Sequence, residues 1–268
     1  MSSPALEVIG LTVRAGGRCL VNVERFSADS GTITAVMGPN GSGKTTLLRA
    51  CLGLVRPSQG RITVLGEDIL ALRGTALAAI RRRIGYVPQL LPARGELPIT
   101  VREVVAIGRT ARAGLCQRLS RHDWATVDRW LAELGLDALA DRTFGEISGG
   151  EQRKTLIARA MAQEPEMLLL DEPTANLDLG WRERMVEALQ ALFARTRLTV
   201  VLVCHELEVL PPACRRVILL EGGQLSATGS PEEVFTTECV HRLYGANLHA
   251  LHCGQRHAVV PGEEARHA

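Results

Sequence analysis

The stretch Gly38-Pro39-Asn40-Gly41-Ser42-Gly43-Lys44-Thr45 matches the pattern GxxxxGK[ST] and decides the fold. It follows a short apolar run, Ile33–Met37, that reads as a strand. It leads into Lys44–Gly53, which reads as a helix ended by its last glycine. Because the pattern lies between a strand and a helix, where a phosphate-binding loop requires it, the sequence predicts such a loop here.

The residue types of this loop suit a polyphosphate. Glycines allow the backbone angles that turn successive N–H groups inward, and the following helix presents its positive N-terminus to the same anion. Lys44 would place a charge on the β- and γ-phosphates, the Thr45 hydroxyl could bind Mg²⁺, and Thr46 continues the cradle. An ordinary glycine-rich junction is the alternative, and the complete pattern in its proper context disfavours it. Alone, the loop indicates only a P-loop nucleoside triphosphatase.

A second pattern places two acids at the end of a buried strand. The apolar run Met167–Leu170 ends in Asp171 and Glu172. In parallel α/β sheets, ligands collect at the carboxyl ends of strands. Asp171 would hold Mg²⁺, and Glu172 would orient or deprotonate an attacking water. Read without the upstream loop, the pair could equally be an Asp-Glu-Pro turn that ends a strand.

A second helix start also resembles an anion site. Ile147-Ser148-Gly149-Gly150-Glu151 precedes an amphipathic stretch, Gln152–Gln163, that reads as a helix. Ser148 and the glycine amides would form another anion cradle at its N-terminus. One chain has no obvious need for two triphosphate cradles, so the second cradle is expected to close on nucleotide held by another copy.

The remaining pattern predicts an α/β protein. Short runs near the start, Leu6–Val13 and Leu20–Ser27, read as hairpin strands. Buried-strand patterns recur at Thr199–Cys204 and Arg216–Leu220, and helices alternate with them. This alternation favours a mostly parallel sheet covered on both faces, and the helical pattern between about Gln89 and Pro165 reads as an insertion.

Composition sets the broad class. The 268 residues include 46% hydrophobic and 3% aromatic residues, with a net charge of +2, which argues against nucleic acid as a partner. The seven cysteines form no CxxC pair, which fits free thiols in a reducing cytosol. No apolar run is long enough to span a bilayer, and Met1–Gly10 lacks the pattern of a signal peptide.

Six elements in order resemble the ABC ATPase family. They are the phosphate loop, Gln89 in Tyr86-Val87-Pro88-Gln89, Ser148–Glu151, the acid pair, Ala175–Asp178 and His205. The resemblance covers residues 5–245 and implies a P-loop NTPase (RecA-like) core with an N-terminal antiparallel β subdomain. It also implies an inserted α-helical subdomain over about 90–165, and it leaves 246–268 as a C-terminal tail.

The resemblance assigns further roles. Gln89 would contact Mg²⁺ and the attacking water and link to a membrane partner, although a glutamine after proline is ordinarily a solvated loop residue. Asp178 would lie in a loop that crosses a dimer interface, whereas read bare it is a helix N-cap. His205 would contact the γ-phosphate, although a lone histidine at a strand end is usually structural.

Two positions depart from the family pattern. Ala15 stands where an aromatic ring commonly stacks on adenine, so we expect weaker adenine discrimination, with Arg14 as a possible planar substitute. Lys154 stands where the helix after the signature commonly has arginine, which keeps the charge and loses the fork geometry.

The resemblance implies a function. A homodimer would hold ATP in two shared sites and would act on separate permease subunits from the inner face of the cell membrane, with a substrate-binding protein as an indirect partner. Residues 99–109 and 243–245 resemble the branch that imports zinc, manganese, siderophores, haem or cobalamin, and Leu90–Thr100 is the expected permease contact. The alternatives are a soluble ATPase that assists iron–sulfur cluster assembly and a nucleotide-binding regulator without turnover. Histidines and cysteines in the tail leave a regulatory metal site open.

Overall fold

The computed structural model describes residues 4–89, 98–114, 117–245 and 247–261. The chain forms two compact units. The first consists of Met1–Ala71 and Leu189–Ala268, and the second consists of Leu72–Ala188. The predicted helical insertion at about 90–165 falls within the second unit, and its limits stay a prediction.

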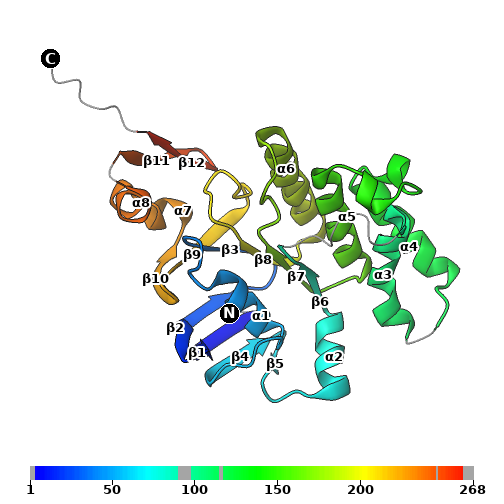
Figure 1. Ribbon diagram of the computed structural model, residues 1–268, viewed down its shortest axis with the longest axis horizontal. Coiled ribbons are helices and arrows are strands. Elements are labelled where there is room, and N and C mark those ends of the chain that lie inside the picture. Colours follow the sequence, from blue (N-terminus) through cyan, green and yellow to red (C-terminus); the bar gives the residue numbers. More distant parts are fainter. Residues whose placement is uncertain (1–3, 90–97, 115–116, 246, 262–268) are drawn as a thin grey trace. The chain divides into compact units, whose positions relative to one another are not determined.

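A sheet forms the centre of the first unit (Figure 1). Its strands follow the order β5-β4-β1-β2-β10-β9-β3-β8. Their bounds are β1 Leu6–Ala15, β2 Arg18–Ala28, β3 Ile33–Met37, β4 Gln59–Val64, β5 Glu67–Asp68, β8 Thr199–Val203, β9 Cys214–Glu221 and β10 Gln224–Gly229.

The two parts of this sheet differ as the sequence predicts. β1 pairs antiparallel with β2 and β4, and buried residues alternate along much of its length. By contrast, all five residues of β3 are buried, and β3 pairs parallel with both β8 and β9. An apolar strand that is covered on both faces needs no alternation. The α/β class is therefore confirmed, with the antiparallel strands at the start of the chain.

Few helices belong to the first unit. α1 (Lys44–Cys51) packs against β2 and β4, and α7 (Pro231–Val234) and α8 (Thr237–Tyr244) follow β10. Serine and threonine side chains cap the latter two helices: Ser230 accepts from the Glu233 amide, and Thr236 accepts from the Cys239 amide.

The expected C-terminal tail contains regular structure. Within it, β11 (Leu248–Cys253) and β12 (Arg256–Pro261) form an antiparallel hairpin. Glu208 accepts a hydrogen bond from the Val259 amide at 2.8 Å, and His252 Nε2 lies 2.9 Å from the Phe235 carbonyl oxygen. No group of three or more possible metal ligands is present among the described residues, so the tail metal site gains no support.

The second unit is mainly helical (Figure 1). Its helices α3, α4 and α5 pack against one another, and α5 also contacts β6. The bounds are α2 Gly74–Arg82, β6 Ile84–Val87, α3 Val101–Ala113, α4 Arg121–Glu133, α5 Gly149–Ala162 and β7 Met167–Asp171, with 3-10 turns at Asp137–Leu139 and Phe144–Glu146. The helix α6 (Leu179–Thr196) begins in this unit and spans the point where the division falls.

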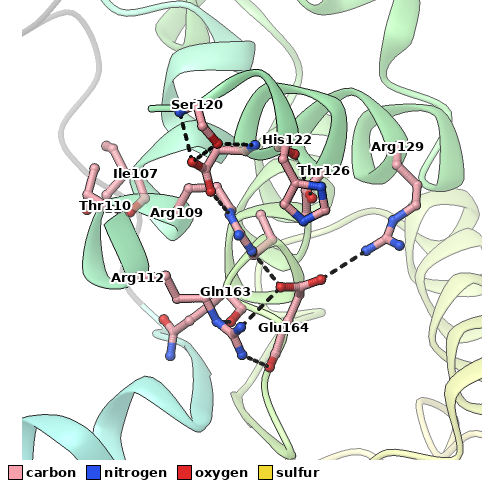
Figure 2. Close-up of polar contacts among 12 residues, drawn as sticks. Ile107, Arg109, Thr110, Arg112, Ser120, His122, Thr126, Arg129, Gln163 and Glu164 are labelled. Atoms are coloured by element: carbon pink, nitrogen blue, oxygen red, sulfur yellow. Dashed lines mark hydrogen bonds and ion pairs between the residues drawn. The ribbon is translucent and has the colours of Figure 1, made fainter. Parts of the chain in front are cut away.

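A buried ion network fixes the end of α5 (Figure 2). Arg109 on α3 is 4% exposed and donates to Asp123 on α4 and to Glu164, each at 2.8 Å. It also donates to the Ala162 carbonyl at 2.9 Å, and Arg112 donates to the Gln163 carbonyl. Four residues separate the end of α5 from β7, so this clamp lies just before the strand that carries the acid pair.

Candidate functional site

The phosphate loop has the conformation that its glycines predict. Gly38, Gly41 and Gly43 have φ angles of 147°, 79° and 96°. A Cβ atom on Gly38 would lie 2.0 Å from the Leu220 carbonyl oxygen, and one on Gly43 would lie 2.7 Å from the Leu20 carbonyl oxygen. Both positions therefore require glycine for space as well as for backbone angle.

The start of α1 is open to an anion. Its N-cap, Gly43, provides no side-chain hydrogen bond to the helix amides. Lys44 is 4% exposed, and its Nζ donates to the Gly38 and Pro39 carbonyl oxygens at 2.8 and 2.9 Å. The Ser42 hydroxyl is buried without a hydrogen-bond partner among the described residues. A helix start without a side-chain cap, a held ammonium group and a buried hydroxyl together fit a triphosphate.

His205 lies at the same edge of the sheet as this loop. β3 and β8 run parallel, with Val36 opposite Val203, and the Cys204 amide donates to the Val36 carbonyl at 3.2 Å. The loop leaves β3 and His205 leaves β8, so both emerge at the carboxyl ends of adjacent strands. The Tyr244 hydroxyl donates to the His205 carbonyl at 3.1 Å, and burial raises the pKa of Tyr244 to about 12.

The second unit brings Gln89 and the acid pair together. β6 and β7 are parallel, with Val87 opposite Leu170, so the residues that follow them meet at one edge. Gln89 Nε2 donates to Glu172 Oε2 at 2.8 Å. Glu172 is 7% exposed and has a φ of 49°, which is uncommon for a residue with a side chain. A backbone conformation of this kind costs free energy and persists only where surrounding contacts fix it. Such residues cluster at functional sites.

At the start of α5, the second anion cradle differs from the prediction in one detail. Ser148 caps the helix, and Glu151 completes a capping box. The Glu151 carboxylate accepts from the Ser148 amide at 2.8 Å and from the Ser148 hydroxyl at 2.7 Å. Glu151 thus occupies the Ser148 donors in this structure, and an incoming phosphate has to compete with it.

Gly150 and Asp178 have clear local roles. A Cβ atom on Gly150 would lie 2.2 Å from the ring of Trp181, so the indole packs directly on this glycine. Asp178 Oδ1 accepts from the Trp181 amide at 2.9 Å, which confirms the predicted N-cap of α6. Leu179, immediately after it, is 74% exposed. The role of Asp178 across a dimer interface stays a prediction.

The residues expected near adenine lie on a hairpin. Arg14 and Ala15 are exposed at the end of β1, opposite Cys19 and Arg18 on β2. Further along β2, the Leu20 carbonyl touches Gly43 of the phosphate loop, so this hairpin adjoins the loop.

Sequence reasoning missed Arg153 on α5. This arginine is 2% exposed and donates to the Pro88 carbonyl oxygen at 2.8 Å and to the Gln89 carbonyl oxygen. Lys154, which drew attention as a departure from the family pattern, instead places its Nζ 5.9 Å from the Trp181 ring centroid. A buried position on the predicted amphipathic helix could have drawn attention to Arg153, but its partners depend on packing between distant segments.

Comparison with family models identifies the chain. The model described as ABC transporter matches residues 21–175, more than half of the sequence. The chain belongs to the ABC transporter family. The resemblance drawn from six motifs is confirmed.

Several curated ABC relatives carry names that refer to import. The chain is 37% identical over 246 residues to a cobalamin import ATP-binding protein of Halobacterium salinarum. That match covers 91% of this chain and 59% of the relative, so the chain spans about three fifths of that protein's length. It is 33% identical over 262 residues to a hemin import ATP-binding protein of Rhizobium meliloti, with 95% of this chain and 94% of the relative covered.

Solved ABC structures share the fold. A chain of a transporter described as of the metal-chelate type, in an inward-facing conformation, superposes with a TM-score of 0.80 at 29% identity. The match covers 97% of this chain and 98% of the other. Among the described residues, no helix has the length and apolar character needed to cross a membrane. Most of the expected permease contact lies outside the described residues, which omit 90–97.

Proposed function

We propose that this chain is the ATP-binding and ATP-hydrolysing subunit of an importer, and that it couples hydrolysis to uptake of a metal ion or metal chelate through a separate permease. The observation that carries the ATPase part is the contact of Gln89 with Glu172 at the ends of β6 and β7. The names of the relatives support the importer part, since they refer to cobalamin and hemin import.

The proposed chemistry is the transfer of the γ-phosphoryl group of ATP to water. The loop from Gly38 to Thr46 would hold the triphosphate, with Lys44 on the β- and γ-phosphates. Glu172 would accept a proton from water while the water oxygen bonds to the γ-phosphorus and the bridging oxygen leaves with ADP. His205 would donate to the γ-phosphate, and Gln89 would orient both the water and the Glu172 carboxylate.

Mg²⁺ fits the donor set of this proposal. Hydroxyl, amide and carboxylate oxygens are the ligands that this cation prefers, and Thr45, Gln89 and Asp171 would hold it. When bound, it would neutralise charge on the phosphate oxygens. The Tyr86 hydroxyl lies 3.4 Å from Asp171 Oδ2.

Two copies of the chain would complete each site. In this proposal the Ser148–Glu151 segment of one copy closes on ATP held by the phosphate loop of the other. The Ser148 hydroxyl and the Gly149 and Gly150 amides would donate to the γ-phosphate once the hydrogen bond between Ser148 and the Glu151 carboxylate breaks. Asp178 and the exposed Leu179 would then face the second copy.

The membrane partner distinguishes this proposal from a soluble iron–sulfur assembly ATPase. We place the chain on the inner face of the membrane, against a polytopic permease that receives cargo from a substrate-binding protein. The import names of the relatives favour this reading over the soluble one.

Affinity purification from solubilised membranes tests it. We expect a polytopic protein in stoichiometric amount, and ATP-dependent uptake of cobalamin, haem, zinc or manganese by proteoliposomes that contain the complex. Complexes carrying Glu172→Gln serve as the matched control and should not accumulate cargo. Recovery of the chain with a soluble scaffold protein alone would contradict the importer proposal.

A further inference from the structure

Arg153 joins two segments that are far apart in the sequence. It lies in the second turn of α5, four residues after the Gly149 that begins this helix. Its two terminal guanidinium nitrogens donate to consecutive carbonyl oxygens, those of Pro88 and Gln89, just after β6. The planar guanidinium fork suits two neighbouring acceptors, which a lysine ammonium could not hold in the same fixed geometry.

Burying the charged side chain of Arg153 costs free energy that an apolar side chain filling the same space would not cost. Arg153 is 2% exposed, and its Nε is buried without a hydrogen-bond partner among the described residues. Burial lowers the pKa of Arg153, and the charges of Asp171 and Glu172 oppose that lowering. A buried charge with an unsatisfied donor stabilises a fold less than an apolar side chain of similar volume. The contacts of Arg153 therefore point to a role in positioning.

The contacts continue from Arg153 to the acid pair. Arg153 holds the Gln89 backbone, and the Gln89 side chain donates to Glu172 Oε2 at 2.8 Å. On the other side, the Gln152 amide donates to the Phe144 and Ile147 carbonyl oxygens, which fixes the segment that leads into α5. The helix start and Arg153 therefore belong to one rigid element, and a shift of this element moves the Gln89 backbone.

We propose that Arg153 is a positioning residue that couples the N-terminus of α5 to Gln89 and, through Gln89, to Glu172. This inference rests on the proposed hydrolysis of ATP with Glu172 as the base. When a phosphate engages Ser148 and its neighbouring amides, α5 settles in one position, and Arg153 holds Gln89 where its amide orients Glu172. Without Arg153 the phosphate loop still binds ATP, but the Glu172 carboxylate loses its fixed orientation.

A series of substitutions at Arg153 tests the coupling. In Arg153→Met, which removes both donors, we expect turnover per dimer to fall about 10- to 100-fold, the scale for a misplaced catalytic group. The Kd for ATP should stay within about twofold, since the phosphate loop is intact. Arg153→Lys should recover part of the turnover, because one ammonium can reach one of the two carbonyls. The matched control is Lys154→Met, one residue along the helix, which should turn over ATP like the parent protein.

A double-mutant cycle with Gln89→Ala separates positioning from a general loss of structure. If Arg153 acts through Gln89, the double variant should be no more than about threefold slower than Gln89→Ala alone, since coupled residues are not additive. Multiplicative losses, or parental turnover in Arg153→Met, would overturn the inference. If Arg153→Met does not fold, the same cycle with Arg153→Lys decides the question. A parent protein that does not hydrolyse ATP would instead contradict the proposed function itself.

Discussion

Gln89 and Glu172 lie 83 residues apart in the sequence and are joined by a 2.8 Å hydrogen bond from Nε2 to Oε2. Parallel pairing of β6 with β7 explains their proximity, because each residue follows the end of its strand. In the proposed mechanism the Gln89 amide holds one carboxylate oxygen of Glu172, and the carboxylate accepts a proton from water. This relationship underlies most of the expectations below.

Replacement of Glu172 with glutamine should separate binding from hydrolysis. The new amide oxygen can still accept from Gln89, so the local structure should persist, while the base is lost. We expect turnover to fall by about 100-fold or more, the usual contribution of a general base. ATP affinity should be retained, and an ATP-bound dimer should accumulate in size-exclusion chromatography. Unchanged turnover would remove Glu172 from its proposed role.

An aromatic residue at position 15 should improve selection for adenine. Ala15 is exposed on the hairpin that touches the phosphate loop through Leu20. For Ala15→Tyr we expect tighter ATP binding by about 1–3 kcal/mol, the scale of base–aromatic stacking. The parent protein should discriminate poorly between ATP and GTP, and fluorescence titration with both nucleotides measures this. A strong ATP preference in the parent protein would contradict the interpretation of Ala15.

Loss of Arg109 should destabilise the second unit. Its removal by Arg109→Met leaves Asp123 and Glu164 without their buried partner, and breaking such a network costs about 3–5 kcal/mol. Arg112→Met is the matched control on the same helix, since the Arg112 side chain is 44% exposed and pairs with the same Glu164. An exposed pair contributes less than about 1 kcal/mol. Urea unfolding measures the free energy of unfolding of both variants. Equal losses of stability in the two variants would contradict a special role for Arg109.

Acid should weaken the same network through Asp123. Hydrogen bonds from Ser120, followed by Arg109, lower the pKa of Asp123 from 3.8 to about 2. The unfolded chain then binds more protons between these values, so stability is complete above the unfolded pKa and falls as pH drops toward the folded one. Asp123→Asn should be less stable than the parent at neutral pH, and the difference should shrink as the pH falls from about 4 to about 2. Denaturant unfolding measures the difference in the free energy of unfolding between the two proteins. A difference that stays constant with pH would contradict a contribution from the lowered pKa of Asp123.

The sequence predicted the elements whose signals are local. The phosphate loop is local because its glycines, lysine and flanking apolar strand are contiguous. The same holds for β7 and for the helix predicted over Gln152–Gln163. In each case, residues close in sequence determine both the conformation and the chemistry.

Other features depend on contacts between distant segments and could not be predicted. Arg153 contacts Gln89, 64 residues away, and nothing near either residue in the sequence indicates this. The hairpin formed by β11 and β12 depends on Glu208 and on the Phe235 carbonyl oxygen, which lie 51 and 17 residues from their partners. Burial lowers the pKa of His257 in this hairpin, an effect that composition alone cannot reveal.

The central claim is that each ATP is held by the phosphate loop of one copy and by the Ser148–Glu151 segment of another. The most direct measurement is ATPase rate per molecule against protein concentration, with the dimer fraction determined in parallel by analytical ultracentrifugation in ATP. The account predicts that the ATPase rate per molecule falls on dilution in step with the dimer fraction. It also predicts that excess Glu172→Gln protein changes the ATPase rate of the parent protein by forming mixed dimers. A rate per molecule that stays constant where only monomer remains would contradict the claim.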